Sequence, residues 1–145
     1  MAPPTEEGCI IAFDFGLKHI GVAVGQTLTR TARGVNTLAA RQGKPNWSAA
    51  TKLIDEYQPF VVVVGLPLNM DGSVSQMAAR ARVFSEQLAR RTEAEIVLHD
   101  ERLTSATAKA DFEDAKAVGK ASTEHELAAC LILESWLNEY FQVCR

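Results

Sequence analysis

Asp14 is the residue of this sequence best placed to do chemistry. It closes an apolar run that starts at Cys9, Gly16 follows it, and a second apolar run extends from Ile20 to Val24. The pattern predicts a carboxylate at the end of a core β-strand, where a lone buried charge costs several kcal/mol unless a partner neutralises it. A metal ion or a phosphate-bearing ligand would be such a partner. A carboxylate that simply reaches water is the alternative.

Two more groups of carboxylates stand at the ends of expected elements. Glu101, beside Asp100, ends the last expected strand, and Glu124 and Glu126 lie in the first turn of the last expected helix. In a mixed sheet such ends can meet at one edge, and clustered carboxylates repel one another unless cations are present. Because neighbours on a strand point to opposite faces, only one of Asp100 and Glu101 can share the face of Asp14.

The carboxylates indicate which metal and which reaction to expect. Oxygen ligands favour Mg²⁺ or Mn²⁺, and the sequence has no His/Cys spacing for zinc. Two such ions about 4 Å apart would activate water and stabilise the leaving oxygen in phosphodiester hydrolysis. Glu126 also has a structural alternative, because Thr123 to Glu126 fits a capping box in which Glu126 bonds the Thr123 amide.

Several residues are candidates for contact with nucleic acid. The loop from Gly65 to Gly72, which contains Asn69, could present backbone N–H groups to a phosphate, although a plain strand-to-helix connection would read the same way. Arg80 and Arg82 stand near the start of the following helix, where they could meet a phosphate backbone. Nucleic-acid contacts are therefore expected at Lys18, Asn69, Arg80 and Arg82.

Apolar periodicity and turn residues predict the elements that hold these side chains. Strands are expected over 9–15, 20–25, 30–38, 60–65 and 95–99, and helices over 47–57, 75–91, 104–115 and 124–141. Asn46 and Ser75 can cap the first two helices. The expected order predicts an α/β fold: three strands come first, followed by a helix, a strand, a helix, a strand and two helices. Its mixed five-stranded sheet would carry helices on both faces.

Composition sets limits on the class of protein. The 145 residues predict one domain over 9–145 after a flexible tail over 1–8, and the net charge of −3 argues against binding nucleic acid by bulk positive charge. A local basic patch stays possible. The three cysteines form no disulfide framework or metal motif, and neither a signal peptide nor a membrane span is visible. We expect a cytoplasmic protein with no membrane partner.

Four segments, AFDFGLKHIGVAVG, VVVVGLPLNMDGS, HDERLTSATA and ELAACLILESW, resemble the YqgF/RuvX family. The resemblance covers Cys9 to about Tyr140. It implies a ribonuclease H-like fold and a metal-dependent nuclease. The substrate it implies is precursor 16S rRNA, whose 5′ end is matured during ribosome biogenesis. A Holliday junction in DNA recombination is the alternative.

The resemblance also implies roles for single residues. Asp14 corresponds to the first metal ligand and Glu101 to the second acid. The third family acid is an aspartate, and His125 stands at its position here. We expect Glu126, one residue further, to complete the metal site, with His125 assisting proton transfer or ligating metal.

Other functions stay open at this stage. The replacement at His125 allows a relative that binds RNA without cutting it. Actin-like and sugar-kinase folds also place Asp-x-Gly after a first strand, but they need two such domains and this chain supplies one. Junction cutting normally requires a two-fold dimer, whereas RNA maturation does not. The sequence is therefore compatible with a monomer or a weak homodimer.

Overall fold

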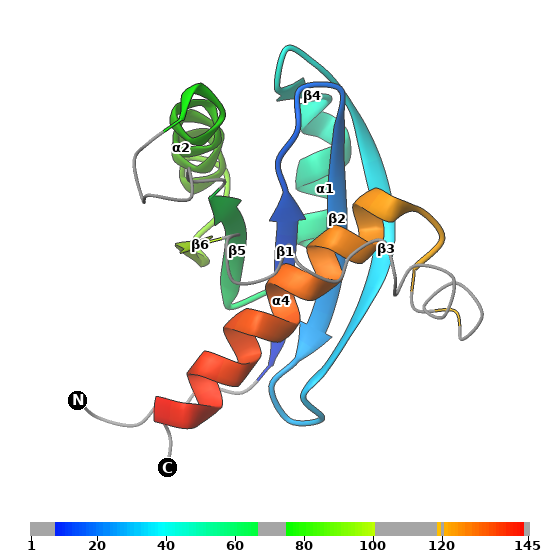
Figure 1. Ribbon diagram of the computed structural model, residues 1–145, viewed down its shortest axis with the longest axis vertical. Helices are drawn as coiled ribbons and strands as arrows, with labels where there is room; N and C mark the ends of the chain where they lie inside the picture. Colours follow the sequence, from blue (N-terminus) through cyan, green and yellow to red (C-terminus); the bar gives the residue numbers. More distant parts are fainter. Residues whose placement is uncertain (1–7, 67–74, 101–118, 120, 144–145) are drawn as a thin grey trace.

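The computed structural model describes residues 8–66, 75–100, 119 and 121–143, and its centre is a sheet of six strands in the order β4-β3-β2-β1-β5-β6 (Figure 1). The strands are β1 (Cys9–Asp14), β2 (His19–Gln26), β3 (Thr31–Arg41), β4 (Lys44–Pro45), β5 (Val61–Leu66) and β6 (Glu95–Asp100). β1 to β4 form an antiparallel meander, while β5 and β6 run parallel to β1. The carboxyl ends of β1, β5 and β6 therefore meet at one edge of the sheet.

The helices among the described residues are α1 (Trp47–Tyr57), α2 (Gln76–Ala89) and α4 (Glu124–Val143). α1 and α2 begin at the predicted caps: the Asn46 side chain accepts from the Ser48 and Ala49 amides, and the Ser75 hydroxyl accepts from the Ala78 amide. Within the described part of the chain, no helix combines the length and the apolar character that crossing a membrane requires.

The predicted α/β fold, with a mixed sheet and helices on both faces, is confirmed. The expected strand count of five is wrong, because Lys44–Pro45 adds a sixth strand by pairing with the end of β3. Two residues are too few to produce the alternation that marks a strand in a sequence. The helix expected over 104–115 lies outside the described residues.

α4 crosses one face of the sheet and α1 lies behind the other (Figure 1). Each face has its own core, and β1 contributes to both by strict alternation. Ile11 and Phe13 pack with α1 and α2, whereas Ile10 and Ala12 pack with α4 on the other face. β5 is buried along its whole length, as its run of valines predicts for a strand covered on both sides. The face to which a strand residue points can therefore be assigned from its position.

Candidate active site

Asp14 lies at the carboxyl end of β1 on the face covered by α4. It is half-buried, it pairs directly with Gly21 of β2, and Gly21 pairs with Thr37 of β3. Directly opposed residues of antiparallel strands point to the same face, and the even-numbered residues of β1 face α4. Asp14, Gly21 and Thr37 thus form one row across three strands beneath the last helix.

The first turn of α4 sits directly on this row. A β-carbon on Gly21 would collide with the backbone carbonyl of His125, so only glycine allows the helix to approach β2 this closely. The hydroxyls of Thr37 and Thr123 share a hydrogen bond of 2.8 Å, which ties β3 to the residue before the helix. The packing therefore brings His125 next to the row of Asp14.

Two imidazoles stack at this edge of the sheet. The rings of His19 and His125 have centroids 4.7 Å apart and planes inclined by 28°. His19 lies two residues before Gly21, so it shares that residue's face, and its side chain is exposed. Lys18 beside it is exposed too, while its carbonyl accepts from the Ala40 amide. The structure thus places Lys18, expected to contact nucleic acid, at the Asp14 end of the sheet.

Glu126 acts as a helix cap. Its side chain is buried, Oε1 accepts from the Ser122 amide at 3.2 Å and Oε2 accepts from the Ser122 hydroxyl at 2.8 Å. Its own amide donates to Thr123 Oγ1 at 3.0 Å. The capping interpretation is borne out with one correction. The carboxylate accepts from the Ser122 amide and not from the predicted Thr123 amide.

The direction of the Glu126 side chain separates it from Asp14. A β-carbon on Gly34 of β3 would collide with the Glu126 side chain, so this side chain lies over β3. β3 is two strand spacings from β1, which is roughly 10 Å. The structure therefore brings the His125 carbonyl onto Gly21 of the Asp14 row, while the side chain of Glu126 is directed to β3. A metal-binding role for Glu126 stays a prediction.

The end of β6 is described as far as Asp100. Ile96 packs in the core of α1 and α2 whereas Val97 packs against α4, so alternation places Asp100 on the face opposite to Asp14. Glu101 and Asn69, the second predicted acid and a predicted nucleic-acid contact, lie outside the described residues. Within the described ranges, no three His, Cys, Asp or Glu side chains converge closely enough to hold a metal ion.

His99 is a buried polar residue of β6 that anchors this strand to α4. Its Nε2 shares a hydrogen bond of 2.8 Å with Ser135 Oγ, and its Nδ1 lies 3.7 Å from Glu139 Oε2. Burial lowers the pKa of His99, and the carboxylates of Glu139 and Asp100 oppose that shift. The sequence offers no signal for this contact, because its partners come from separate elements.

The predicted basic contacts do not form one surface. Arg80 and Arg82 are exposed on α2, which packs on the face opposite to α4. Lys18 is exposed in the turn between β1 and β2, beside the row of Asp14. Of the contacts described, Lys18 therefore lies nearest to the predicted chemistry.

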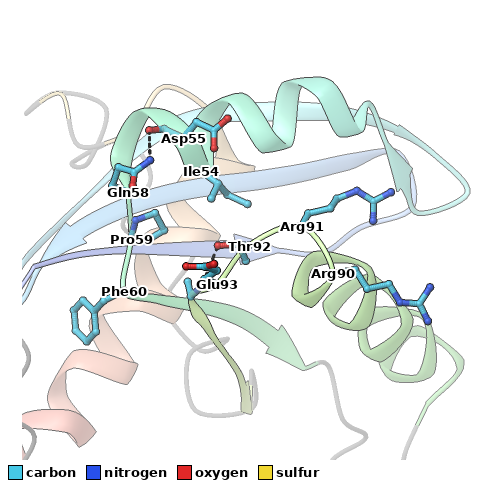
Figure 2. Close-up of a pocket in the computed structure, with 10 residues that line it drawn as sticks. Ile54, Asp55, Gln58, Pro59, Phe60, Arg90, Arg91, Thr92 and Glu93 are labelled. Atoms are coloured by element: carbon cyan, nitrogen blue, oxygen red, sulfur yellow. Dashed lines mark hydrogen bonds between the residues drawn. The ribbon is translucent and has the colours of Figure 1, made fainter.

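A hollow of about 680 Å³ lies at the other end of the sheet, where β5 and β6 begin (Figure 2). It is lined by Ile54, Asp55, Gln58, Pro59, Phe60, Arg90, Arg91, Thr92, Glu93 and Ala94. The Arg91 guanidinium lies 4.1 Å from the centroid of the Trp47 ring and bonds the Gln87 carbonyl at 2.8 Å. This hollow is remote from the carboxyl edge that carries Asp14.

Solved structures of low sequence identity resemble the chain in fold. RuvC of T. thermophilus in complex with a Holliday junction substrate superposes with a TM-score of 0.62 at 12% identity, over 94% of this chain and 97% of that one. The Fowlpox virus resolvase in complex with Holliday junction DNA gives a TM-score of 0.56 at 12% identity, over 90% and 97% of the two chains. At such identities the likeness establishes the fold alone.

Sequence comparison is more specific. A relative from Pectobacterium carotovorum subsp. carotovorum (strain PC1) is 51% identical over 132 residues, which are 89% of this chain and 94% of the relative. A relative from Yersinia enterocolitica is 47% identical over 133 residues, or 90% and 94% of the two chains. Both carry the name "Putative pre-16S rRNA nuclease". The model of the RuvX family, described as Holliday junction resolvase, matches residues 8–139, and the chain belongs to this family.

Proposed function

We propose that this protein is a metal-dependent nuclease that hydrolyses phosphodiester bonds and matures the 5′ end of pre-16S rRNA. The observation that carries the proposal is the row of Asp14, Gly21 and Thr37 beneath the first turn of α4. It holds a carboxylate at an open sheet edge in a chain whose relatives, about half identical in sequence, are named for this activity.

Asp14 and Glu101 are the proposed metal ligands. Their carboxylates are hard oxygen donors of the kind that Mg²⁺ and Mn²⁺ prefer. When bound, two such ions activate water and stabilise the leaving oxygen of a phosphodiester. The pairing of β1 with β2 fixes the backbone of Asp14 and the face of the sheet to which its side chain points.

His125 is the proposed third functional side chain. It lies above the Asp14 row, at the position where the resemblance to the YqgF/RuvX family implies an aspartate, and an imidazole there can hold or transfer a proton. Glu126 is the competing third ligand. To serve, it would have to give up both of its hydrogen bonds to Ser122 and turn away from β3.

The Holliday junction is the second candidate substrate. The family description names it, and two of the solved structures of similar fold are bound to such junctions. Cutting both strands symmetrically would require a two-fold dimer. RNA maturation makes no such demand, so we propose a cytoplasmic enzyme that works as a monomer or a weak homodimer.

The test compares wild type with Asp14→Asn on a precursor 16S rRNA fragment and on a four-way DNA junction, with Mg²⁺ or Mn²⁺ titrated. We expect cleavage of the RNA that depends on the metal and falls at least about a hundredfold in the variant, since even outer-shell changes cost ten- to a hundredfold. Its melting temperature should stay or rise, because one clustered negative charge is removed.

Asp55→Asn is the matched control. Asp55 is an exposed residue of α1 at the other end of the sheet, so this variant should cleave normally. Near-normal cleavage by Asp14→Asn would refute the assigned site. If the wild type binds RNA and never cuts it, the protein is an RNA-binding protein and not a nuclease. If it cuts the four-way DNA junction in preference to the RNA, the junction is its main substrate.

A further inference from the structure

His19 and His125 form a stacked pair, and only His125 has a role in the chemistry proposed above, where it holds or transfers a proton. The two rings come from β2 and from the first turn of α4, and their centroids lie 4.7 Å apart. Contact at this distance and inclination is typical of offset aromatic stacking. His125 is half-buried and supports the inner side of the pair, whereas His19 is exposed.

The surroundings of the pair are those of a substrate surface. Asp14 and His19 point to the same face of the sheet, from neighbouring strands and at the same edge. Lys18 and Leu17 are exposed in the turn that leads into His19. An RNA strand whose phosphate were bound through metal ions at Asp14 would therefore pass the exposed His19 imidazole, with the Lys18 ammonium beside it.

The ring geometry favours an aromatic ligand over a metal ion. The planes are inclined by only 28°, so the nitrogen lone pairs of the two rings lie in two separate, nearly parallel planes, an arrangement poorly suited to binding one metal ion. No group of three potential metal ligands that includes this pair exists among the described residues. An exposed ring backed by a second ring presents its face, and nucleobases are bound by such faces.

We propose that His19, supported by His125, is a stacking platform for an unpaired base of the RNA substrate, adjacent to the phosphate that is cleaved at the Asp14 site. This inference rests on the proposed function, because it concerns the substrate of that site. It specifies a substrate with a single-stranded segment or an extruded base at the point of cleavage. Lys18 contacts the backbone of the same strand.

The test measures binding without cleavage. A short single-stranded RNA carries 2-aminopurine at each position in turn, and its fluorescence is titrated with protein in EDTA over a range of salt concentrations. Wild type should quench the fluorophore at one or two positions. His19→Ala should weaken binding roughly tenfold and abolish that quenching, since stacking contributes about this much per base.

Substitutions at the same position separate stacking from charge. His19→Phe keeps a ring and should bind close to wild type, whereas His19→Lys supplies a cation without a ring and should bind like His19→Ala. Lys18→Ala is the neighbouring control: it should flatten the slope of log K against log salt by about 0.7, while His19→Ala leaves the slope unchanged. Fully paired RNA should not respond to His19→Ala.

Three results would overturn the platform: unchanged binding by His19→Ala, wild-type binding by His19→Lys with weak binding by His19→Phe, or Zn²⁺ binding that His19→Ala removes. The first two results would show that stacking by His19 does not contribute to RNA binding. The third would show that the two histidines bind a metal ion. These outcomes are separable from the nuclease assay, because a protein that stacks RNA but never cuts it refutes the proposed reaction alone.

Discussion

The two faces of the sheet are built from the same strands and hold different kinds of residues. The face covered by α1 and α2 contains an aromatic cluster in which Phe84 contacts Phe13, Phe15 and Trp47 at centroid distances of 5.4 to 5.6 Å. The face covered by α4 holds apolar residues together with Asp14, His19, Thr37, His99 and Glu126. Both faces have an apolar core, but the polar residues near the predicted site lie on the α4 face.

The α4 face keeps its buried polar groups by giving them partners. Three hydrogen bonds join α4 or its cap to neighbouring residues: Thr37 with Thr123, His99 with Ser135, and Glu126 with Ser122. A buried polar group without a partner would cost about 1–3 kcal/mol. The contacts that stabilise α4 are therefore also those that hold His125 near Asp14, and mutations on the two faces should have different consequences.

Phe84→Ala should produce the largest loss of stability. Phe84 is 2% exposed at the centre of the aromatic cluster, so truncation should lower the free energy of unfolding by about 3–5 kcal/mol. Cleavage by the fraction that stays folded should be near normal, because Phe84 lies on the face of the sheet opposite to Asp14. Urea unfolding with parallel nuclease assays measures both.

Val83→Ala is the control for this substitution, since Val83 is 55% exposed and should change stability by less than about 0.5 kcal/mol. A large loss of cleavage by folded Phe84→Ala would contradict the separation of the two faces.

Gly21→Ala should affect stability and function together. The new methyl group would meet the His125 carbonyl, so α4 must move, at a cost of about 1–3 kcal/mol for overpacking. The same movement should carry His125 away from Asp14 and reduce cleavage. Thermal melting and single-turnover cleavage are the measurements, and a destabilised variant with full activity would show that the closeness of α4 to β2 is irrelevant to catalysis.

Glu126→Gln should have a small effect if the carboxylate only caps the helix. Glutamine can still accept from the Ser122 amide, so stability should fall by less than about 1 kcal/mol through the weaker interaction with the helix dipole. Mn²⁺ affinity and cleavage should be unchanged, whereas His125→Ala should lose cleavage. A fall in Mn²⁺ affinity in Glu126→Gln, with His125→Ala unaffected, would instead give the third position to Glu126.

His99→Gln should change how stability depends on pH. Burial lowers the pKa of His99 below its ordinary value of 6.5, so between the two values the unfolded chain binds more protons and stability rises with pH. The stability that neutral His99 contributes is fully present above pH 6.5, which is the ordinary pKa of histidine in the unfolded chain. It is lost as the pH falls from 6.5 through the lowered pKa of the folded protein. The variant should therefore lose less stability than wild type between about pH 7.5 and 5.5 in urea titrations.

His19→Gln is the control for the pH experiment, because His19 is exposed. It should follow the wild-type profile. An unchanged profile in His99→Gln would show that other groups set the acid sensitivity.

Much of the fold could be predicted from local patterns, because caps and periodicity act within a few residues. Asn46 and Ser75 mark the starts of α1 and α2, and the four valines of β5 mark a strand buried on both faces. β4 was missed because two residues carry no period. Asp14 was identified because a charge at the end of an apolar run is a local anomaly.

The remainder of the site depends on contacts between distant parts of the chain. His19 and His125 stand in unrelated sequence contexts, and only the approach of α4 to Gly21 brings them together. The bond from Glu126 to Ser122, in place of Thr123, depends on the path of the chain before α4. No local pattern encodes either contact, so the relative importance of Glu126 and His125 could not be predicted.

The clasp between Thr37 and Thr123 has a consequence for the synthesis of this protein. β1 to β3 are made first and carry Asp14 and His19, but the residues that lie over them belong to α4, which follows all six strands. A chain that stops before Thr123 would carry the first carboxylate and lack the opposing histidine. During synthesis, the pair of His19 and His125 can therefore form only after every strand of the sheet has been made.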